Sequence, residues 1–170
     1  LLNENLIGKI TLYATSEQGY KNLTKLSSKS YLNNKMNHDP HCDVNDLILN
    51  NEDLILLTGN YNDFFGKLFY ANKIKQFEKI IEKFKLSFKD RMYVEIQRHG
   101  ENLESNYENY LLKISSSYDL PIIASQEVYY LDRSMAEAHD ALLCIGEKQF
   151  IDDKNRFRYS NQHYLKKNEE

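Results

Sequence analysis

Residues 74–97, IKQFEKIIEKFKLSFKDRMYVEIQ, contain an amphipathic helix followed at once by a short strand. The apolar side chains of the first part recur at helical spacing: Ile74, Phe77, Ile81, Phe84 and Phe88. Lys and Glu fill the opposite face, so the pattern predicts a helix of about 17 residues whose aromatic stripe packs in a core. The second part, RMYVEIQ at 91–97, is expected to be a strand.

The same order of elements extends in both directions from this stretch. Further strands are predicted at 7–14, 53–58 and 120–125, and the apolar run of the last is typical of a strand covered on both faces. Further helices are predicted after the candidate N-caps Ser16 and Asp43 and around 103–114 and 135–145, with a loop at 31–42. Alternating strands and helices predict parallel pairing, in either a doubly wound sheet or a piece of a β/α barrel.

Composition bounds the class of protein. The chain has 170 residues, a net charge of -3 and 41% hydrophobic residues, as expected for one ordinary domain whose surface is not broadly basic. No stretch is apolar enough for a membrane span. Cys42 and Cys144 match no CxxC spacing, and reduced thiols in a cytosolic protein are expected. The first residue is not Met and no signal peptide follows, so we expect a chain cut from something longer.

Ligand chemistry in parallel α/β folds lies at the carboxyl ends of the strands. There the sequence places Asn60, His99 and Glu127, with Tyr129 beside them. Imidazole and carboxylate groups suit Zn, Mn or Fe. The competing interpretation is that His99 is a hydrogen-bonded structural residue and that His139, within a predicted helix, has a packing role. Glycine motifs for nucleotide binding are absent.

Several segments together resemble a known family. In chain order they are ATSEQGYKNL at 14–23, YVEIQRHG at 93–100, LPIIAS at 120–125, AEAHDALLCI at 136–145, IDDKNRFR at 151–158 and HYLK at 163–166. The sequence resembles, from about residue 7 to 167, the PHP (polymerase and histidinol phosphatase) domain of the bacterial DNA polymerase III alpha subunit. The resemblance implies an α/β fold that is a partial, distorted PHP-type β/α barrel lacking its N-terminal strands. It also implies a PHP part at 1–147 and, at 148–170, a segment connecting toward the polymerase core.

Departures from the family pattern fall at the metal pocket. Thr58-Gly59-Asn60 stands where metal-competent members have SGC, and Gln126-Glu127-Val128-Tyr129-Tyr130 stands where they have NDxHY. Asn60 and Tyr129 are therefore substituted pocket positions, and neutral tyrosine is a poor metal ligand. His99 and Glu127 remain as a remnant pocket, and we expect no bound PHP metal, no catalytic residue in this piece and a structural or docking role.

The implied parent is the replicative DNA polymerase, a cytoplasmic, Mg²⁺-dependent enzyme with no membrane contact. Its expected partners are the rest of the polymerase chain, a proofreading exonuclease subunit, other replicase subunits and DNA. Arg156 and Arg158, in a locally basic tail, are candidate DNA contacts, although a solvated face is the competing interpretation. The alternative function is a freestanding PHP-type metal-dependent phosphoesterase.

Overall fold

A computed structural model describes residues 6–32 and 39–167. The described residues form a mixed α/β fold with a sheet in the order β1-β2-β3-β4, in agreement with the predicted class. Its strands are β1 (Thr11–Ala14), β2 (Leu54–Leu57), β3 (Met92–Ile96) and β4 (Ile122–Ala124). Each lies inside a segment predicted as a strand.

Six α-helices accompany the sheet in the described part of the chain. They are α1 (Glu17–Leu32), α2 (Val44–Leu49), α3 (Phe64–Tyr70), α4 (Ile74–Phe88), α5 (Glu104–Tyr118) and α6 (Ala136–Glu147). All except α3 were predicted. The sequence of α3, FFGKLFY, is apolar on nearly every side and most of the helix is buried, so it shows no helical periodicity.

The loop predicted at residues 31–42 needs correction at its start. The predicted loop at 31–42 begins late, because α1 continues through Leu32. Residues 39–42 have no regular structure, and 33–38 lie outside the described residues.

The pairing of β1 with β2 is antiparallel, whereas the alternation of elements predicted parallel pairing throughout. The reason is that two helices in series join these strands. Lys29 near the end of α1 pairs with Asp46 of α2, and Asn22 donates to the carbonyl of Glu52, so the chain runs out along α1 and back along α2. It therefore re-enters the sheet beside the end of β1. The pairing of β2 with β3 is parallel, as predicted.

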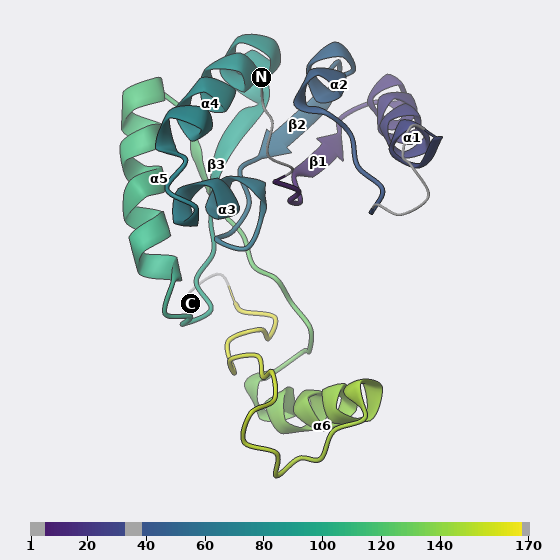
Figure 1. Ribbon diagram of the computed structural model, residues 1–170, viewed down its shortest axis with the longest axis vertical. Coiled ribbons are helices and arrows are strands. Elements are labelled where there is room, and N and C mark those ends of the chain that lie inside the picture. The colour runs from purple at the N-terminus through teal and green to yellow at the C-terminus, as the bar shows by residue number, and fades with distance from the viewer. Residues whose placement is uncertain (1–5, 33–38, 168–170) are drawn as a thin grey trace. The chain divides into compact units, whose positions relative to one another are not determined.

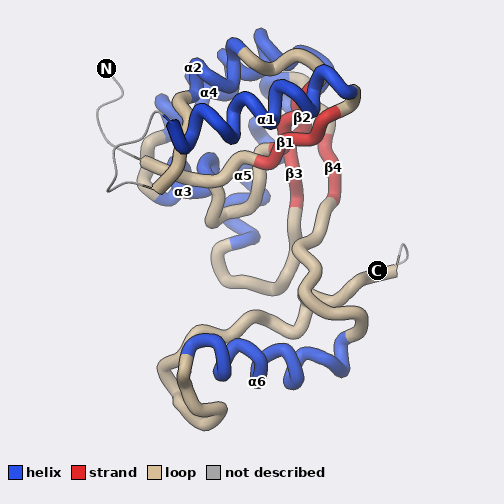
Figure 2. Tube along the Cα trace, turned by 90° about the vertical axis from the view of Figure 1, so that its right-hand side faces the viewer, coloured by secondary structure: helices blue, strands red, loops and turns tan. Residues whose placement is uncertain are grey.

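The helices gather on one side of the sheet, as Figures 1 and 2 show for α2, α3 and α4. The side chains that point toward them from β2 and β3 are fully buried: Leu54, Leu56, Met92 and Val94. The opposite face is only partly covered. In β4, Ile122 is 50% exposed and Ile123 is also exposed, so the prediction of a strand covered on both faces is wrong. β4 is the last strand in the sheet order and lies at its edge.

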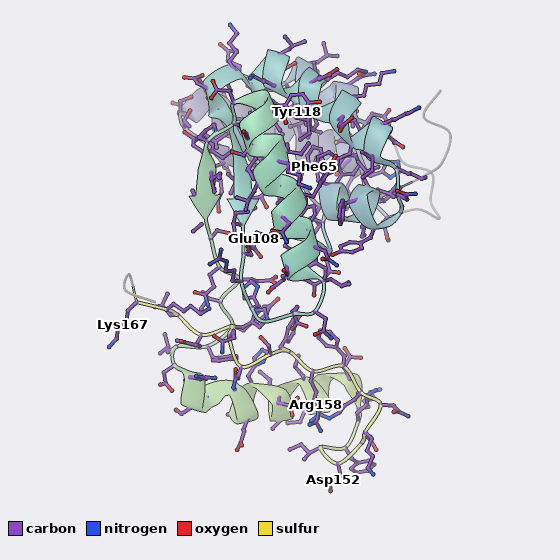
Figure 3. All side chains as sticks on the ribbon, turned by 90° about the vertical axis from the view of Figure 1, so that its left-hand side faces the viewer. Phe65, Glu108, Tyr118, Asp152, Arg158 and Lys167 are labelled. Atoms are coloured by element: carbon purple, nitrogen blue, oxygen red, sulfur yellow. The ribbon has the colours of Figure 1, made fainter. Side chains whose placement is uncertain are left out.

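The aromatic stripe of α4 is the centre of the core, as predicted. Phe77, Phe84 and Phe88 are fully buried, and Phe65 of α3 contacts the rings of both Phe77 and Phe84. Phe65 lies among the side chains between the helices in Figure 3. Burial of phenylalanine side chains contributes about 1.5–3 kcal/mol each, so this cluster is a large part of the stability.

The chain divides into two compact units. The first unit comprises residues 1–96 and 106–123, and the second comprises 97–105 and 124–170. The first unit therefore contains α4 and nearly all of the sheet, whereas the second contains α6 and the segments around it. The predicted division at 147 and 148 stays a prediction. Within the described ranges, no helix combines the length and the apolar character needed to span a bilayer.

We expect Phe84→Ala to destabilise the protein by about 3–5 kcal/mol, because it removes a fully buried ring from a close-packed cluster. The matched control is Lys79→Ala at an exposed position of the same helix, which should change stability by less than about 0.5 kcal/mol. Urea denaturation followed by circular dichroism measures both. Equal effects of the two substitutions would show that the stripe is not core.

Candidate functional site

In the first unit, the segment after β2 forms a tight turn stabilised by carboxylates. The Gly59 N–H donates to Oε2 of the buried Glu95 at 3.1 Å, and the Asn60 N–H donates to Oδ2 of Asp63 at 2.9 Å. Gly59 has a φ of +79°, and an added Cβ would lie 2.6 Å from the Asp63 carboxylate. The Asn60 side-chain oxygen accepts the Asn62 N–H at 2.8 Å, which gives Asn60 a turn-forming role.

In the second unit, His99 lies just after β3 and is 3% exposed. Its Nε2 accepts the backbone N–H of Glu127 at 3.2 Å, and Nδ1 lies 3.2 Å from Oε1 of Glu104. Because a backbone N–H can only donate, Nε2 is the acceptor and the proton resides on Nδ1, which donates to Glu104. Both ring nitrogens are thus engaged in hydrogen bonds within the protein.

The Glu104 carboxylate organises the loop around His99. In addition to the imidazole, it accepts the backbone N–H groups of His99, Gly100 and Glu101 at 2.8–3.1 Å. An acidic residue in the first turn of α5 is favourable there because unpaired N–H groups carry partial positive charge. Glu104 was not predicted as a site residue, although its place shortly after His99-Gly100 at the start of a helix is a signal in the sequence.

A second buried histidine completes this arrangement. His163 stacks on His99 with ring centroids 4.2 Å apart and planes 2° apart. Its Nδ1 donates to the Glu127 carbonyl at 3.1 Å, whereas its buried Nε2 has no hydrogen-bond partner among the described residues. Burial lowers the pKa of His99, and the adjacent His163 lowers it further, so His99 is neutral near pH 7. His163 was not predicted as a site residue.

Tyr129 and Glu127 lie on the segment after β4, against this histidine pair. The Tyr129 ring contacts His163 at 5.1 Å and stacks on His139 at 5.3 Å between centroids. Its hydroxyl donates to Tyr159 at 3.3 Å. Burial and the hydrogen bonds to Tyr159 and Glu127 hold the pKa of Tyr129 well above its ordinary value. A tyrosinate ligand is therefore strongly disfavoured, and His139 has the packing contacts that were expected of it.

The segment containing His163 is bound to the loop of His99 by further hydrogen bonds. The Ser160 hydroxyl donates to the His99 carbonyl, and Lys166 donates to the Arg98 carbonyl. The Tyr129 N–H donates to the His163 carbonyl at 2.8 Å. His99 and His163 therefore lie where three separate segments of the second unit meet, and we call the two residues the histidine pair.

The predicted remnant pocket can be compared with this geometry. The second unit brings His99, Glu127 and Tyr129 together, and Asn60 belongs to the first unit. His99 meets Glu127 through the backbone N–H of Glu127. Metal ligation needs an imidazole lone pair, and the one on Nε2 of His99 is occupied. Among the residues described, no three His, Cys, Asp or Glu side chains are grouped to hold a metal. The second unit in this arrangement therefore does not fit a PHP metal, while the ligand roles of His99 and Glu127 stay a prediction.

The candidate DNA contacts lie on the loop after α6, where Figure 3 labels Arg158 and Asp152. The Arg156 guanidinium is buried and forms a two-pronged ion pair with Asp140 of α6. This hydrogen-bonded pair lowers the pKa of Asp140. Arg158 donates to the Ile151 carbonyl at 2.9 Å. Arg156 therefore stabilises the loop, and DNA contact by either residue stays a prediction.

Comparison with known proteins agrees with the resemblance in the sequence. Residues 4–99 match the PHP domain family. DNA polymerase III subunit alpha of Vibrio cholerae is 35% identical over 159 residues, which are 93% of this chain and 14% of that protein. The Rickettsia prowazekii subunit is 37% identical over 153 residues, 88% of this chain and 13% of that protein. The Borreliella burgdorferi subunit is 33% identical over 175 residues, covering 100% of this chain and 15% of that protein.

With a matched family region of more than half its length, the chain belongs to the PHP domain family. Within that family it corresponds to the PHP-domain segment of DNA polymerase III alpha subunits, which it matches along most of its sequence. The sequence motifs predicted a PHP domain and a similarity to the DNA polymerase III alpha subunit, and both predictions are confirmed. The chain spans about a seventh of the length of these relatives, at 14% of the Vibrio cholerae protein.

Protonation of His99 at acidic pH should lower the stability of the second unit. The lowered folded pKa means that the unfolded chain binds the proton first as the pH falls. The stabilisation is therefore complete above the ordinary value of 6.5 and is lost as the pH falls from there through the folded pKa. We expect the protection factors of residues 159–166, measured by hydrogen exchange with mass spectrometry and corrected for the slower intrinsic exchange at low pH, to fall between about pH 7.5 and pH 5.5.

The control for this pH effect is His41→Gln, at a half-exposed histidine of the first unit, which should retain it. His99→Gln should abolish most of the pH dependence and destabilise the protein by about 0.5–1.5 kcal/mol, because the part-buried hydrogen bond from the Glu127 N–H to Nε2 is lost. An unchanged pH dependence in His99→Gln would exclude His99 as its source.

We expect the chain to bind zinc or manganese weakly and without fixed stoichiometry. After dialysis against chelator-treated buffer, elemental analysis should find well below one equivalent, since a closed zinc site needs about four ligands. His99→Ala should leave that residual amount unchanged. Retention of one equivalent that His99→Ala removes would contradict both expectations.

Proposed function

We propose that this chain is the PHP part of a replicative DNA polymerase III alpha subunit, and that this part is a structural scaffold without hydrolytic activity of its own. The complete protein would add deoxynucleotides to a primer on a DNA template, with Mg²⁺ bound by residues of its polymerase region. The observation that carries the proposal is similarity to alpha subunits over 88–100% of the chain.

The geometry around His99 supports a scaffold role. A hydrolytic metal site needs about three protein ligands and an open position for water. Here the buried imidazole of His99 forms hydrogen bonds with Glu104 and with the Glu127 backbone. The Tyr129 hydroxyl, at the position where metal-competent members have histidine, is neutral. The strand-end residues thus hold loop segments together, as a scaffold requires.

The partners follow from the same proposal. The complete subunit would contact a proofreading exonuclease subunit, other replicase subunits and DNA, and it would work in the cytoplasm. Arg158, on the loop after α6, is the better candidate for a phosphate contact, because the Arg156 guanidinium is engaged with Asp140. A DNA contact by Arg158 would add about one unit to the salt dependence of binding.

The complete reading frame and its protein product test the proposed function. We expect the frame to encode a polymerase region, and the purified full-length protein to extend a primer on a DNA template in the presence of Mg²⁺. We also expect no release of phosphate from p-nitrophenyl phosphate with Mn²⁺ or Zn²⁺, because the described residues bring no three His, Cys, Asp or Glu side chains together as metal ligands.

The matched control is Tyr129→Phe in the same full-length protein, which removes the hydroxyl and keeps the ring packing. It should retain primer extension, since a scaffold requires the ring contacts of Tyr129 with His139 and His163. A short frame without a polymerase region, combined with phosphatase activity, would instead establish the freestanding phosphoesterase.

A further inference from the structure

Two of the eight phenylalanines of the chain are exposed, and both lie on one loop of the second unit. Phe150 is 80% exposed and Phe157 is 67% exposed, whereas the phenylalanines of α3 and α4 are buried or half-buried. The loop comprises residues 148–158, directly after α6, and carries the labelled Asp152 and Arg158 in Figure 3. We call it the basic loop. Large aromatic rings are normally removed from water, so two exposed rings on one short loop indicate a binding surface.

Hydrogen bonds hold the two parts of the basic loop side by side. The Arg158 guanidinium donates to the Ile151 carbonyl at 2.9 Å. Phe157 directly precedes Arg158, and Phe150 directly precedes Ile151, so this bond brings together the two segments that carry the rings. The Asp153 carboxylate closes the first turn by accepting the Phe150 N–H at 2.8 Å. The rings therefore belong to an ordered loop, which reduces the entropy lost when a ligand binds.

The basic loop also carries positive charge. It contains four basic and two acidic residues, although the whole chain has a net charge of -3. Arg156 is engaged with Asp140 of α6. The other basic side chains of the loop are exposed: Lys148, Lys154 and Arg158. Asp152 offsets part of this charge, and the balance of the loop remains positive. Exposed aromatic rings and exposed cations thus occur on the same eleven-residue loop.

This combination matches the chemistry of a single-stranded nucleic acid. Bases stack on exposed aromatic rings while lysine and arginine bind the phosphates, and stacking tolerates any base because every base has a flat face. In duplex DNA the bases already stack on one another, so their faces are not available to phenylalanine. A protein partner fits less well, because lysine is depleted in the cores of protein interfaces.

We propose that the basic loop binds single-stranded DNA, with bases stacked on Phe150 and Phe157 and phosphates bound by Lys154 and Arg158. This inference rests on the proposed function, in which the full-length protein copies a DNA template and Arg158 is the candidate phosphate contact. It adds the aromatic contacts and the preference for a single strand. The single-stranded template ahead of the primer end is the form of DNA that this surface fits.

Protection from trypsin in the full-length protein tests the proposal at the loop itself. Lys154 is exposed, so we expect rapid cleavage after it in the absence of DNA. A single-stranded oligothymidylate of about 20 nucleotides should slow this cleavage by about five-fold or more. The same oligothymidylate paired with oligoadenylate should protect far less. Mass spectrometry of the released peptides assigns the cleavage to Lys154.

Substitutions at Phe157 separate base stacking from general apolar contact. Phe157→Leu keeps an apolar side chain and removes the ring. It should raise the oligothymidylate concentration needed for half-protection by about five-fold or more, as loss of a base–aromatic stack does. Phe157→Tyr keeps the ring and should leave that concentration unchanged. The matched control Ile151→Ala removes another exposed apolar side chain of the same loop and should also leave it unchanged.

Each of three results would overturn the proposal. Slow cleavage after Lys154 without DNA would show that another protein surface covers the basic loop. Protection that the single strand does not produce, or produces no better than the duplex, would exclude single-strand binding. Equal effects of Phe157→Leu and Ile151→Ala would exclude stacking, and Phe150→Leu repeats this comparison at the second ring. Primer extension by the unmodified protein reports the proposed function separately, so either idea can fail alone.

Discussion

Packing of the α4 aromatic stripe against β2 and β3 is the interaction on which the first unit depends. Phe77, Phe84 and Phe88 are fully buried against strand residues such as Leu56 and Val94. That contact fixes β2 and β3 side by side with Leu56 opposite Met92, and hence aligns the ends of the two strands. The turn at Gly59 can then donate to the buried Glu95, so the polar geometry after β2 is a consequence of the apolar packing before it.

The second unit is organised by different physical forces. Its segments meet at the stacked rings of the histidine pair, and Glu104 and the Glu127 backbone hold the ring of His99. Hydrogen bonds of this kind are worth more in a buried setting, but each depends on the correct protonation state. The second unit is therefore expected to respond to pH, whereas the first unit, stabilised by apolar burial, is expected to respond mainly to changes in packing.

Local periodicity explains which elements were predictable from the sequence. The stripe of α4 and the short apolar run of β3 are local features, and both elements were predicted at nearly their observed bounds. The direction of β1 relative to β2 depends on how α1 and α2 are paired, which no local pattern contains. At the site, the rule of strand ends selected His99, Glu127 and Tyr129, which lie close together in the second unit, but the partner His163 comes from a distant segment. Ring stacking between residues that are far apart in the chain produces no regular spacing in the sequence.

A structural and a metal-binding role for His99 exclude one another in this geometry. Binding a metal through Nε2 would take away the acceptor of the Glu127 N–H and break a part-buried hydrogen bond, at a cost of about 1 kcal/mol. Binding through Nδ1 would displace its proton from Glu104, whose carboxylate also holds three backbone N–H groups. A strong ligand set could offset such costs. With Tyr129 neutral and no third acidic, cysteine or histidine side chain grouped nearby in the described residues, the hydrogen-bonded state is the favoured one.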